Sequence, residues 1–149
     1  MKENIEDEEK EIKQNIVHQI IAREWEFFQS VHNTGGRASC QDNYEEFNIM
    51  RSSQWAIFSL PVLRSYLDDL ILAGHRGRNP VMEKYAYMMK YSAPEEYEGI
   101  KEFLPVISEQ KGEIVEKIVK IYLEWELEIM EKYPGITNKG RKLYSESDT

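Results

Sequence analysis

Apolar residues recur at helical spacing in every long segment of this chain, and glycine and proline fall almost entirely between those segments. No segment shows a convincing strand-like alternation of apolar and polar residues. The pattern predicts a long helix over about residues 4–31, a second from 42 to the proline at 61, and a third over 61–73. A fourth helix begins at 80, a short fifth runs through 104, and a long last helix covers about 109–133.

These segments define the fold class that we expect. A chain of 149 residues is the size of one domain. We therefore predict an all-α, single-domain bundle of five or six helices over residues 1–134, with long first and last helices. Residues 135–149 are polar, lack an apolar face and are expected to form a mobile tail.

Composition excludes several classes of protein. The net charge of −8 opposes binding to nucleic acid, because an acidic surface repels phosphate. Cys40 is the single cysteine, which excludes an internal disulfide, a cysteine zinc site and an iron–sulfur cluster. The sequence has no apolar run long enough to span a membrane and no apolar segment near its acidic N-terminus. We expect a cytoplasmic protein with no membrane or nucleic-acid partner.

Local sequence signals place the helix ends. Asp42, Asn79, Ser92 and Ser108 each stand where an N-cap is expected. Gly74 is the residue expected to follow the end of the third helix.

The first helix carries a charge in the middle of its apolar face. With Glu24 set at zero on a helical wheel, Val17 lies at about 20° and Phe28 at about 40° on one side, and Val31 and Ile20 lie equally close on the other. Glu26 points almost the opposite way. Glu24 is therefore predicted to face the core.

The second and last helices repeat this anomaly. Arg51 lies among the apolar positions of its helix, which are Tyr44, Phe47, Trp55 and Phe58, with Gln54 beside it. In the last helix Glu126 lies near the middle of the apolar face. Tyr85 holds the corresponding place in the fourth helix. If all these helices share one core, Glu24, Arg51 and Glu126 meet in a buried polar cluster, with Gln54 and Tyr85 around it.

Two interpretations of the cluster stay open. An unpaired buried charge is costly, so the three side chains are expected to pair with one another. In the first interpretation, this Glu–Arg–Glu network has a structural role alone and fixes the packing of the helices. Alternatively, the cluster is a ligand or active site, where Arg51 grips a carboxylate or phosphate. In that case Glu24 is the candidate general acid or base, Glu126 pairs or orients, and Gln54 and Tyr85 position the ligand.

The glycine-containing loops offer weaker candidates. Cys40 lies near a helix start and Arg37, a setting that favours a thiolate, so it is a second catalytic candidate. Gly35-Gly36, followed by Arg37 and a helix start, offers a backbone site for an anion, which makes Arg37 a ligand-binding candidate. Cys40 and the Gly-Gly loop are then expected at the mouth of the pocket. A flexible interhelical turn is the favoured interpretation of this loop. The basic loop 75–78 is a small patch for which solvated charges are the default interpretation.

A metal centre is not expected. Di-metal helical bundles use glutamate–histidine pairs three residues apart, and no histidine here follows a glutamate at that spacing. No cofactor is indicated by any motif.

Several strings resemble a bacterial family of unknown function, domain-of-unknown-function family 4125. They are Glu24-Trp25-Glu26-x-Phe28, Gly35-Gly36-Arg37-Ala38-Ser39-Cys40-Gln41-Asp42, Met50-Arg51-Ser52-Ser53-Gln54, and Glu83-Lys84-Tyr85-Ala86-x-Met88-Met89 with its continuation Tyr91-x-Ala93-Pro94-x-Glu96-Tyr97. The resemblance covers about residues 24–133 and implies a bacterial cytoplasmic protein, with no assigned reaction. Its strings include the inward residues that the helical phases identify.

Two functional hypotheses follow. The first is a protein that binds, and in an enzymatic version converts, a small polar or anionic molecule at the Glu/Arg/Tyr cluster. The alternative is a non-catalytic interaction module or homodimer, in which the cluster is structural. For this alternative, Ile5, Ile12 and Ile16 of the long first helix are available to pair with a partner helix or a second copy.

Overall fold

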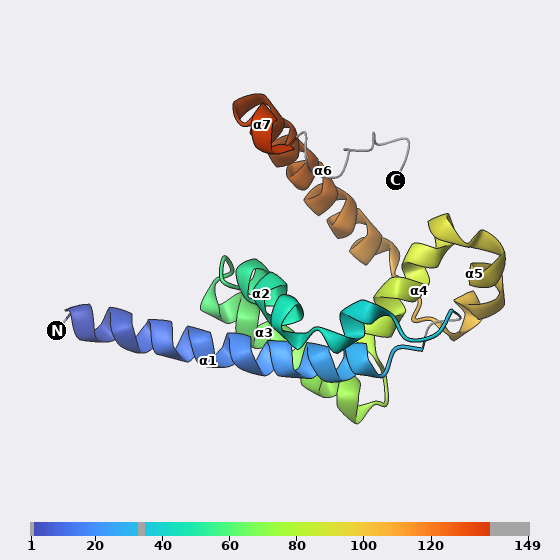
Figure 1. Cartoon of the computed structure of the whole chain (residues 1–149), viewed down its shortest axis with the longest axis horizontal. Coiled ribbons are helices and arrows are strands. Elements are labelled where there is room, and N and C mark those ends of the chain that lie inside the picture. The colour runs from blue at the N-terminus through green and yellow to red at the C-terminus, as the bar shows by residue number, and fades with distance from the viewer. Residues whose placement is uncertain (1, 33–34, 138–149) are drawn as a thin grey trace. The chain divides into compact units, whose positions relative to one another are not determined.

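The computed structural model describes residues 2–32 and 35–137, and this part of the chain is all-helical, without a strand (Figure 1). Its α-helices are α1 (Lys2–Gln29), α2 (Tyr44–Trp55), α3 (Leu60–His75), α4 (Pro80–Ser92), α5 (Pro94–Ile100), α6 (Glu109–Lys132) and α7 (Pro134–Thr137). Two short 3-10 helices, η1 (Ser39–Asp42) and η2 (Lys101–Phe103), precede α2 and follow α5. The predicted all-α class is confirmed. The described residues contain seven α-helices, where five or six were expected.

The chain divides into two compact units, Met1–Leu104 and Pro105–Thr149. The first unit contains α1 to α5, and the second contains α6 and α7. The sequence indicated one domain over residues 1–134, because Pro105 reads only as the end of a helix. Of the predicted tail, residues 135–137 belong to α7, and residues 138–149 lie outside the described part of the chain.

Helix α1 is the central element of the first unit. It packs against α2, α3 and α4, and Figure 1 shows α2 and α3 alongside it. The core holds apolar side chains from three helices, which are Ile16, Val17, Ile20, Ile21, Trp55, Leu63, Leu67 and Leu70. The stripe of α1 that its helical phase predicted is the buried one, because a helix stabilises a small unit mainly by burying one apolar face. Glu24 lies in this stripe.

The N-caps of α4 and α6 are as predicted. Asn79 caps α4, and its side-chain oxygen accepts hydrogen bonds from the amides of Val81 and Met82 at 3.0 Å. Ser108 caps α6 by accepting from the amide of Lys111 at 3.3 Å. Such caps satisfy amides of the first turn that have no partner within the helix.

Other helix ends differ from the predictions by one to three residues. Asn43, not Asp42, caps α2, because Asp42 is the last residue of η1. Ser92 ends α4 and leaves Ala93 as the residue before α5. Helix α3 continues through the predicted stop, and Gly77, with φ of 65°, supplies the left-handed residue after its end. At α2 a neighbouring residue of equal capping ability takes the role of the cap. At α3 and α4 the helix continues through the residue that was expected to lie outside it.

The second unit differs from the first in its burial. Helix α6 has a polar face and an apolar face, yet none of its side chains is buried. Large apolar residues along it are about half exposed, among them Val115, Ile118, Tyr122, Trp125 and Ile129.

Candidate functional site

The carboxylate of Glu24 is the centre of a buried hydrogen-bond cluster. Only 2% of this residue is exposed. Arg51 binds it with two groups, Nε to Oε2 at 2.7 Å and the second guanidinium nitrogen to Oε1 at 2.5 Å. The Tyr66 hydroxyl donates to Oε1 at 2.8 Å, and the indole of Trp55 donates to Oε2 at 3.2 Å. Each carboxylate oxygen thus accepts two hydrogen bonds, which fills its ordinary capacity.

Arg51 is held from three sides. Besides Glu24, it donates from its other terminal nitrogen to Oε1 of Gln54 at 2.6 Å. Its guanidinium carbon lies 5.3 Å from the ring centre of Trp55, in cation–π contact. Burial lowers the pKa of Arg51, but the hydrogen bond and negative charge of Glu24 outweigh burial, and the net effect raises this pKa. The guanidinium is therefore charged, and it neutralises Glu24.

Tyr66 is fixed as a hydrogen-bond donor. Its ring stacks on Trp55 with the centres 4.3 Å apart. Burial, followed by the charge of Glu24, raises the pKa of Tyr66 far above its ordinary value. The hydroxyl keeps its proton at neutral pH and directs it to Glu24.

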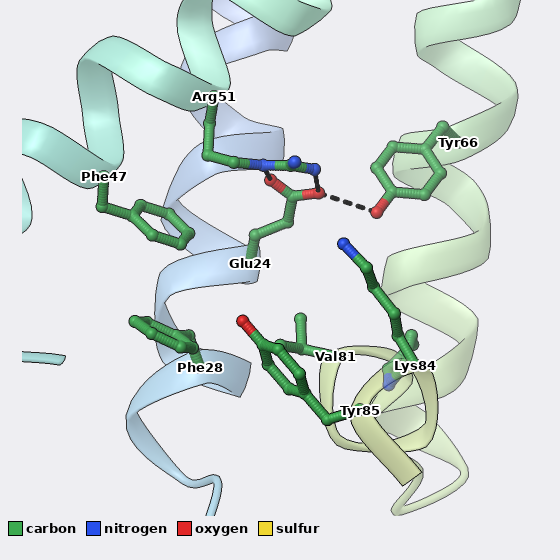
Figure 2. Close-up of a pocket in the computed structure, with 9 residues that line it drawn as sticks. Glu24, Phe28, Phe47, Arg51, Tyr66, Val81, Lys84 and Tyr85 are labelled. Carbon is green, nitrogen blue, oxygen red and sulfur yellow. Dashed lines mark hydrogen bonds and ion pairs between the residues drawn. The ribbon is translucent and has the colours of Figure 1, made fainter. Parts of the chain in front are cut away.

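A cavity of about 120 Å³ lies beside this cluster. Its lining comes from α1, α2, α3 and α4, and comprises Glu24, Phe28, Phe47, Arg51, Tyr66, Pro80, Val81, Lys84 and Tyr85. Figure 2 shows the ion pair at one side, two phenylalanines at another, and the Lys84 amine and Tyr85 hydroxyl reaching in from α4. Phe28 and Phe47 stack with their centres 5.4 Å apart. The cavity combines an apolar wall with a few directed polar groups, as ligand pockets do.

Helix α4 is tied to α1 through its capping residue. While the oxygen of Asn79 caps α4, its amide nitrogen donates to the carbonyl of Phe27 at 2.8 Å and to Oγ of Ser30 at 2.9 Å. One side chain therefore fixes the start of α4 against the end of α1. This places Lys84 and Tyr85 over the cavity.

Three of the predicted site residues meet at this cavity, and a fourth lies next to it. Glu24, Arg51 and Tyr85 line the cavity, and Gln54 contacts Arg51 without lining it. Tyr85 is 41% exposed. Burial and the nearby Cys40 raise the pKa of Tyr85, against the influence of Arg51, so its hydroxyl is also a protonated donor at neutral pH.

The loop candidates have other surroundings. The Nε of Arg37 donates to Asp42 at 2.8 Å, and the guanidinium also binds the side chain of Gln29 and the carbonyl oxygen of Gln41. These bonds close the loop between α1 and α2, and Arg37 does not line the cavity. Cys40 is exposed in η1 and does not line it either.

Glu126 belongs to a different unit of the chain from the Glu24 cluster. It is exposed on α6, in the second unit, whereas the donors to Glu24 all belong to the first. The expected pairing of Glu126 with the cluster stays a prediction. Its physical basis was the assumption that every apolar helix face packs into one core, and α6 buries none of its residues.

Sequence reasoning missed Tyr66, Trp55 and Lys84 as site residues. Trp55 was counted only among the apolar positions of its helix. A buried indole or phenol needs a hydrogen-bond partner, and this requirement was a usable signal for both aromatic residues. Lys84 gave no signal, because a lysine beside an apolar stripe ordinarily extends into water.

Gln41 was also missed, although it has a structural role near the site. It is 1% exposed, and its side-chain amide donates to the carbonyls of Phe28 at 2.8 Å and Val31 at 3.1 Å. The Phe28 carbonyl also accepts from the amide of Val31 at 3.2 Å, so the bonds from Gln41 complete the hydrogen bonding at and just after the end of α1. They hold η1 against α1, next to a residue that lines the cavity.

The arrangement indicates what chemistry the site can support. Because all four acceptor positions of Glu24 are occupied, a ligand would have to displace a donor to reach its oxygens. The geometry favours Glu24 as a positioning residue. The groups best placed to meet a ligand are the Lys84 amine and the Tyr85 hydroxyl. Among the described side chains, no group of three or more His, Cys, Asp or Glu residues is arranged to hold a metal.

Comparisons with known proteins identify a family whose description assigns no function. Over the described ranges, no helix is long and apolar enough to cross a membrane. Neither the curated proteins nor the solved structures gave a match to this chain. A family model described as "Protein of unknown function (DUF4125)" matches residues 14–149, a range that includes every residue lining the cavity. The chain therefore belongs to the DUF4125 family of proteins of unknown function.

Proposed function

We propose that this protein binds a small polar or anionic molecule in the cavity between α1, α2, α3 and α4. One observation carries the proposal. The buried Glu24–Arg51 pair forms a rigid polar wall, and beside it Lys84 and Tyr85 direct hydrogen-bond donors into a partly apolar cavity.

Binding is supported more directly than turnover. The candidate acid or base, Glu24, has no free acceptor position, and the candidate nucleophile, Cys40, does not line the cavity. We therefore assign the cavity to ligand recognition.

A thermal-shift screen tests the proposal. Small carboxylates, phosphates and neutral polar molecules are added to the full chain and to a Val81→Phe variant, in which the larger side chain fills the cavity. A ligand at 100 times its Kd stabilises the native state by about 2.7 kcal/mol, a readily measured shift. Val62→Phe, on the exposed side of α3, is the matched control.

The expected result is stabilisation of the wild-type chain and of Val62→Phe, with loss of the effect in Val81→Phe. If no compound stabilises the wild-type chain, or if the shift survives in Val81→Phe, the cavity is not the binding site and the proposal fails.

A second function, homodimerisation, is favoured by a different observation from the one first considered. Ile16 is buried in its own core and Ile12 is 38% exposed, so the apolar face expected for pairing through α1 is largely used within the unit, while Ile5 lies outside the described side chains. On α6, by contrast, Val115 and its apolar neighbours at alternating spacings of three and four residues are about half exposed.

That spacing is the heptad pattern of helices that pair with each other. In an antiparallel pair, the lysines at 117 and 120 of one copy would lie opposite the acidic end of the other, residues 124–131. Sedimentation of the wild-type chain and of Tyr122→Glu tests the pairing. A dimer that becomes a monomer in the variant supports it, and a monomeric wild-type chain at high concentration refutes it.

A further inference from the structure

The charges around the cavity do not cancel. Glu24 and Arg51 neutralise each other, and the remaining ionisable lining residue with a formal charge at neutral pH is Lys84. Among the residues described, Lys84 makes no ion pair and no side-chain hydrogen bond, whereas its neighbour Glu83 is paired with Arg78. The lining therefore carries one uncompensated positive charge.

This charge reaches the cavity because of where it lies on α4. Val81, Lys84 and Tyr85 are three and four residues apart, a spacing that puts them on one face of a helix. Val81 and Tyr85 line the cavity with Lys84. Figure 2 shows the amine of Lys84 directed toward the hydroxyl of Tyr66 and the Glu24–Arg51 pair. A lysine free to extend into water is here available above a partly apolar pocket.

The free polar groups of the cavity suit the same kind of ligand as the positive charge of Lys84. The Tyr85 hydroxyl has no hydrogen-bond partner among the described residues and points into the cavity, so it can donate to a ligand. The Tyr66 hydroxyl donates a hydrogen bond to Glu24, and its oxygen can still accept one. With the Lys84 amine, the cavity offers two donors that have no partner among the described residues, and the two oxygens of a carboxylate can accept from them.

The volume limits the size of the ligand. A cavity of about 120 Å³ is smaller than the pockets of about 300–1,000 Å³ that hold drug-sized ligands, so it admits only a small molecule. The stacked rings of Phe28 and Phe47 favour a hydrocarbon part over a second charged group. A dianion such as phosphate would leave one charge unpaired, because Arg51 is already committed to Glu24.

We propose that the ligand class of this cavity is a short-chain monocarboxylate, whose carboxylate binds the Lys84 amine and the Tyr85 hydroxyl and whose hydrocarbon part contacts Phe28 and Phe47. This inference rests on the proposed function of the cavity as a ligand site and names its chemistry. Lys84 is the charge that selects the ligand, and the Glu24–Arg51 pair is the wall that keeps the cavity open.

Calorimetric titration with three probes tests the proposal. Butyrate is the monoanion, butyramide is its neutral counterpart of the same shape, and inorganic phosphate represents a multiply charged anion. Each is titrated into the wild-type chain, Lys84→Met, Lys90→Met and Val81→Phe. Lys84 and Lys90 are both exposed on α4, so neither change threatens folding, but only Lys84 lines the cavity.

We expect butyrate to bind the wild-type chain and Lys90→Met equally, and to bind Lys84→Met at least tenfold more weakly. Butyramide should bind weakly, and its affinity should be the same for the wild-type chain and for Lys84→Met. The inference is overturned if butyramide or phosphate binds better than butyrate, or if Lys84→Met leaves butyrate binding unchanged.

These outcomes separate the two proposals. Binding of butyramide or phosphate that Val81→Phe abolishes leaves the cavity as a ligand site and rejects only the monocarboxylate. If none of the three probes binds, the monocarboxylate assignment fails, while the wider screen decides the fate of the cavity itself.

Discussion

Replacing Glu24 by glutamine is the most informative perturbation of the cluster. The change keeps the size of the side chain but removes the charge that pairs with Arg51. Breaking a buried ion pair on one side costs about 3–5 kcal/mol. The side chain of Arg51 is 21% exposed, so part of its charge can be hydrated, and the amide oxygen of glutamine still accepts hydrogen bonds. We therefore expect a loss of about 2–3 kcal/mol in the free energy of unfolding of the first unit.

Urea unfolding followed by tryptophan fluorescence measures this loss. The assay is made in a Trp125→Phe background, so that the remaining tryptophans, Trp25 and Trp55, both report on the first unit. With an urea dependence of about 2 kcal/mol per molar, the midpoint should fall by about 1 M.

Glu26→Gln is the matched control for this measurement. Glu26 lies two residues away in the same helix but is exposed, so the same chemical change should alter the free energy of unfolding by less than about 0.5 kcal/mol. Equal shifts for the two variants would refute the reasoning, because they would show that burial and pairing of Glu24 contribute nothing to stability. A shift for Glu24→Gln below that of the control would do the same.

The remaining predictions concern the donors to Glu24 and the attachment of α4. Tyr66→Phe should lower the free energy of unfolding by about 1.5–3 kcal/mol, as for a hydrogen bond to a charged group. Folding raises the pKa of Tyr66, so just above pH 10 only the unfolded chain loses this proton. The free energy of unfolding of the wild-type chain should therefore fall above pH 10. Urea titrations at pH 8–11 should show that Tyr66→Phe lacks this part of the fall. Asn79→Ala should cost about 1 kcal/mol for the cap alone, plus the bonds to α1. Asn79→Asp keeps the cap and should cost less than Asn79→Ala in thermal unfolding, while equal losses would show that the bonds to α1 carry the whole effect.

The helical phase of α1 was sufficient to find the centre of the site. Its apolar stripe is long, so an error of one or two residues at either end does not rotate the assignment of Glu24. The same argument identified Arg51 on α2. A charge in the middle of an apolar face requires an opposite partner, and that requirement predicted the pair before any distance was known.

The failures have a common physical origin. Helical phase says which face of a helix is apolar, but it does not say which other helix covers that face. Glu126 was assigned to the cluster for this reason; α6 belongs to a separate unit, and the assignment stays a prediction. Tyr66 and Lys84 were missed because their roles depend on how α3 and α4 cross α1, which the spacing of residues along one helix does not encode.

The residues around the cavity form two groups, which we call the buried frame and the exposed edge. The frame is the Glu24–Arg51 pair, whose hydrogen bonds come from helices packed in the core. The edge is α4, which buries only Ala86 among its residues and depends on Asn79 for its attachment to α1. Segments with little buried surface open at lower free energy than the core. The two side chains proposed to meet the ligand, Lys84 and Tyr85, therefore lie on the less buried element, whereas the Glu24–Arg51 pair is held by helices of the core.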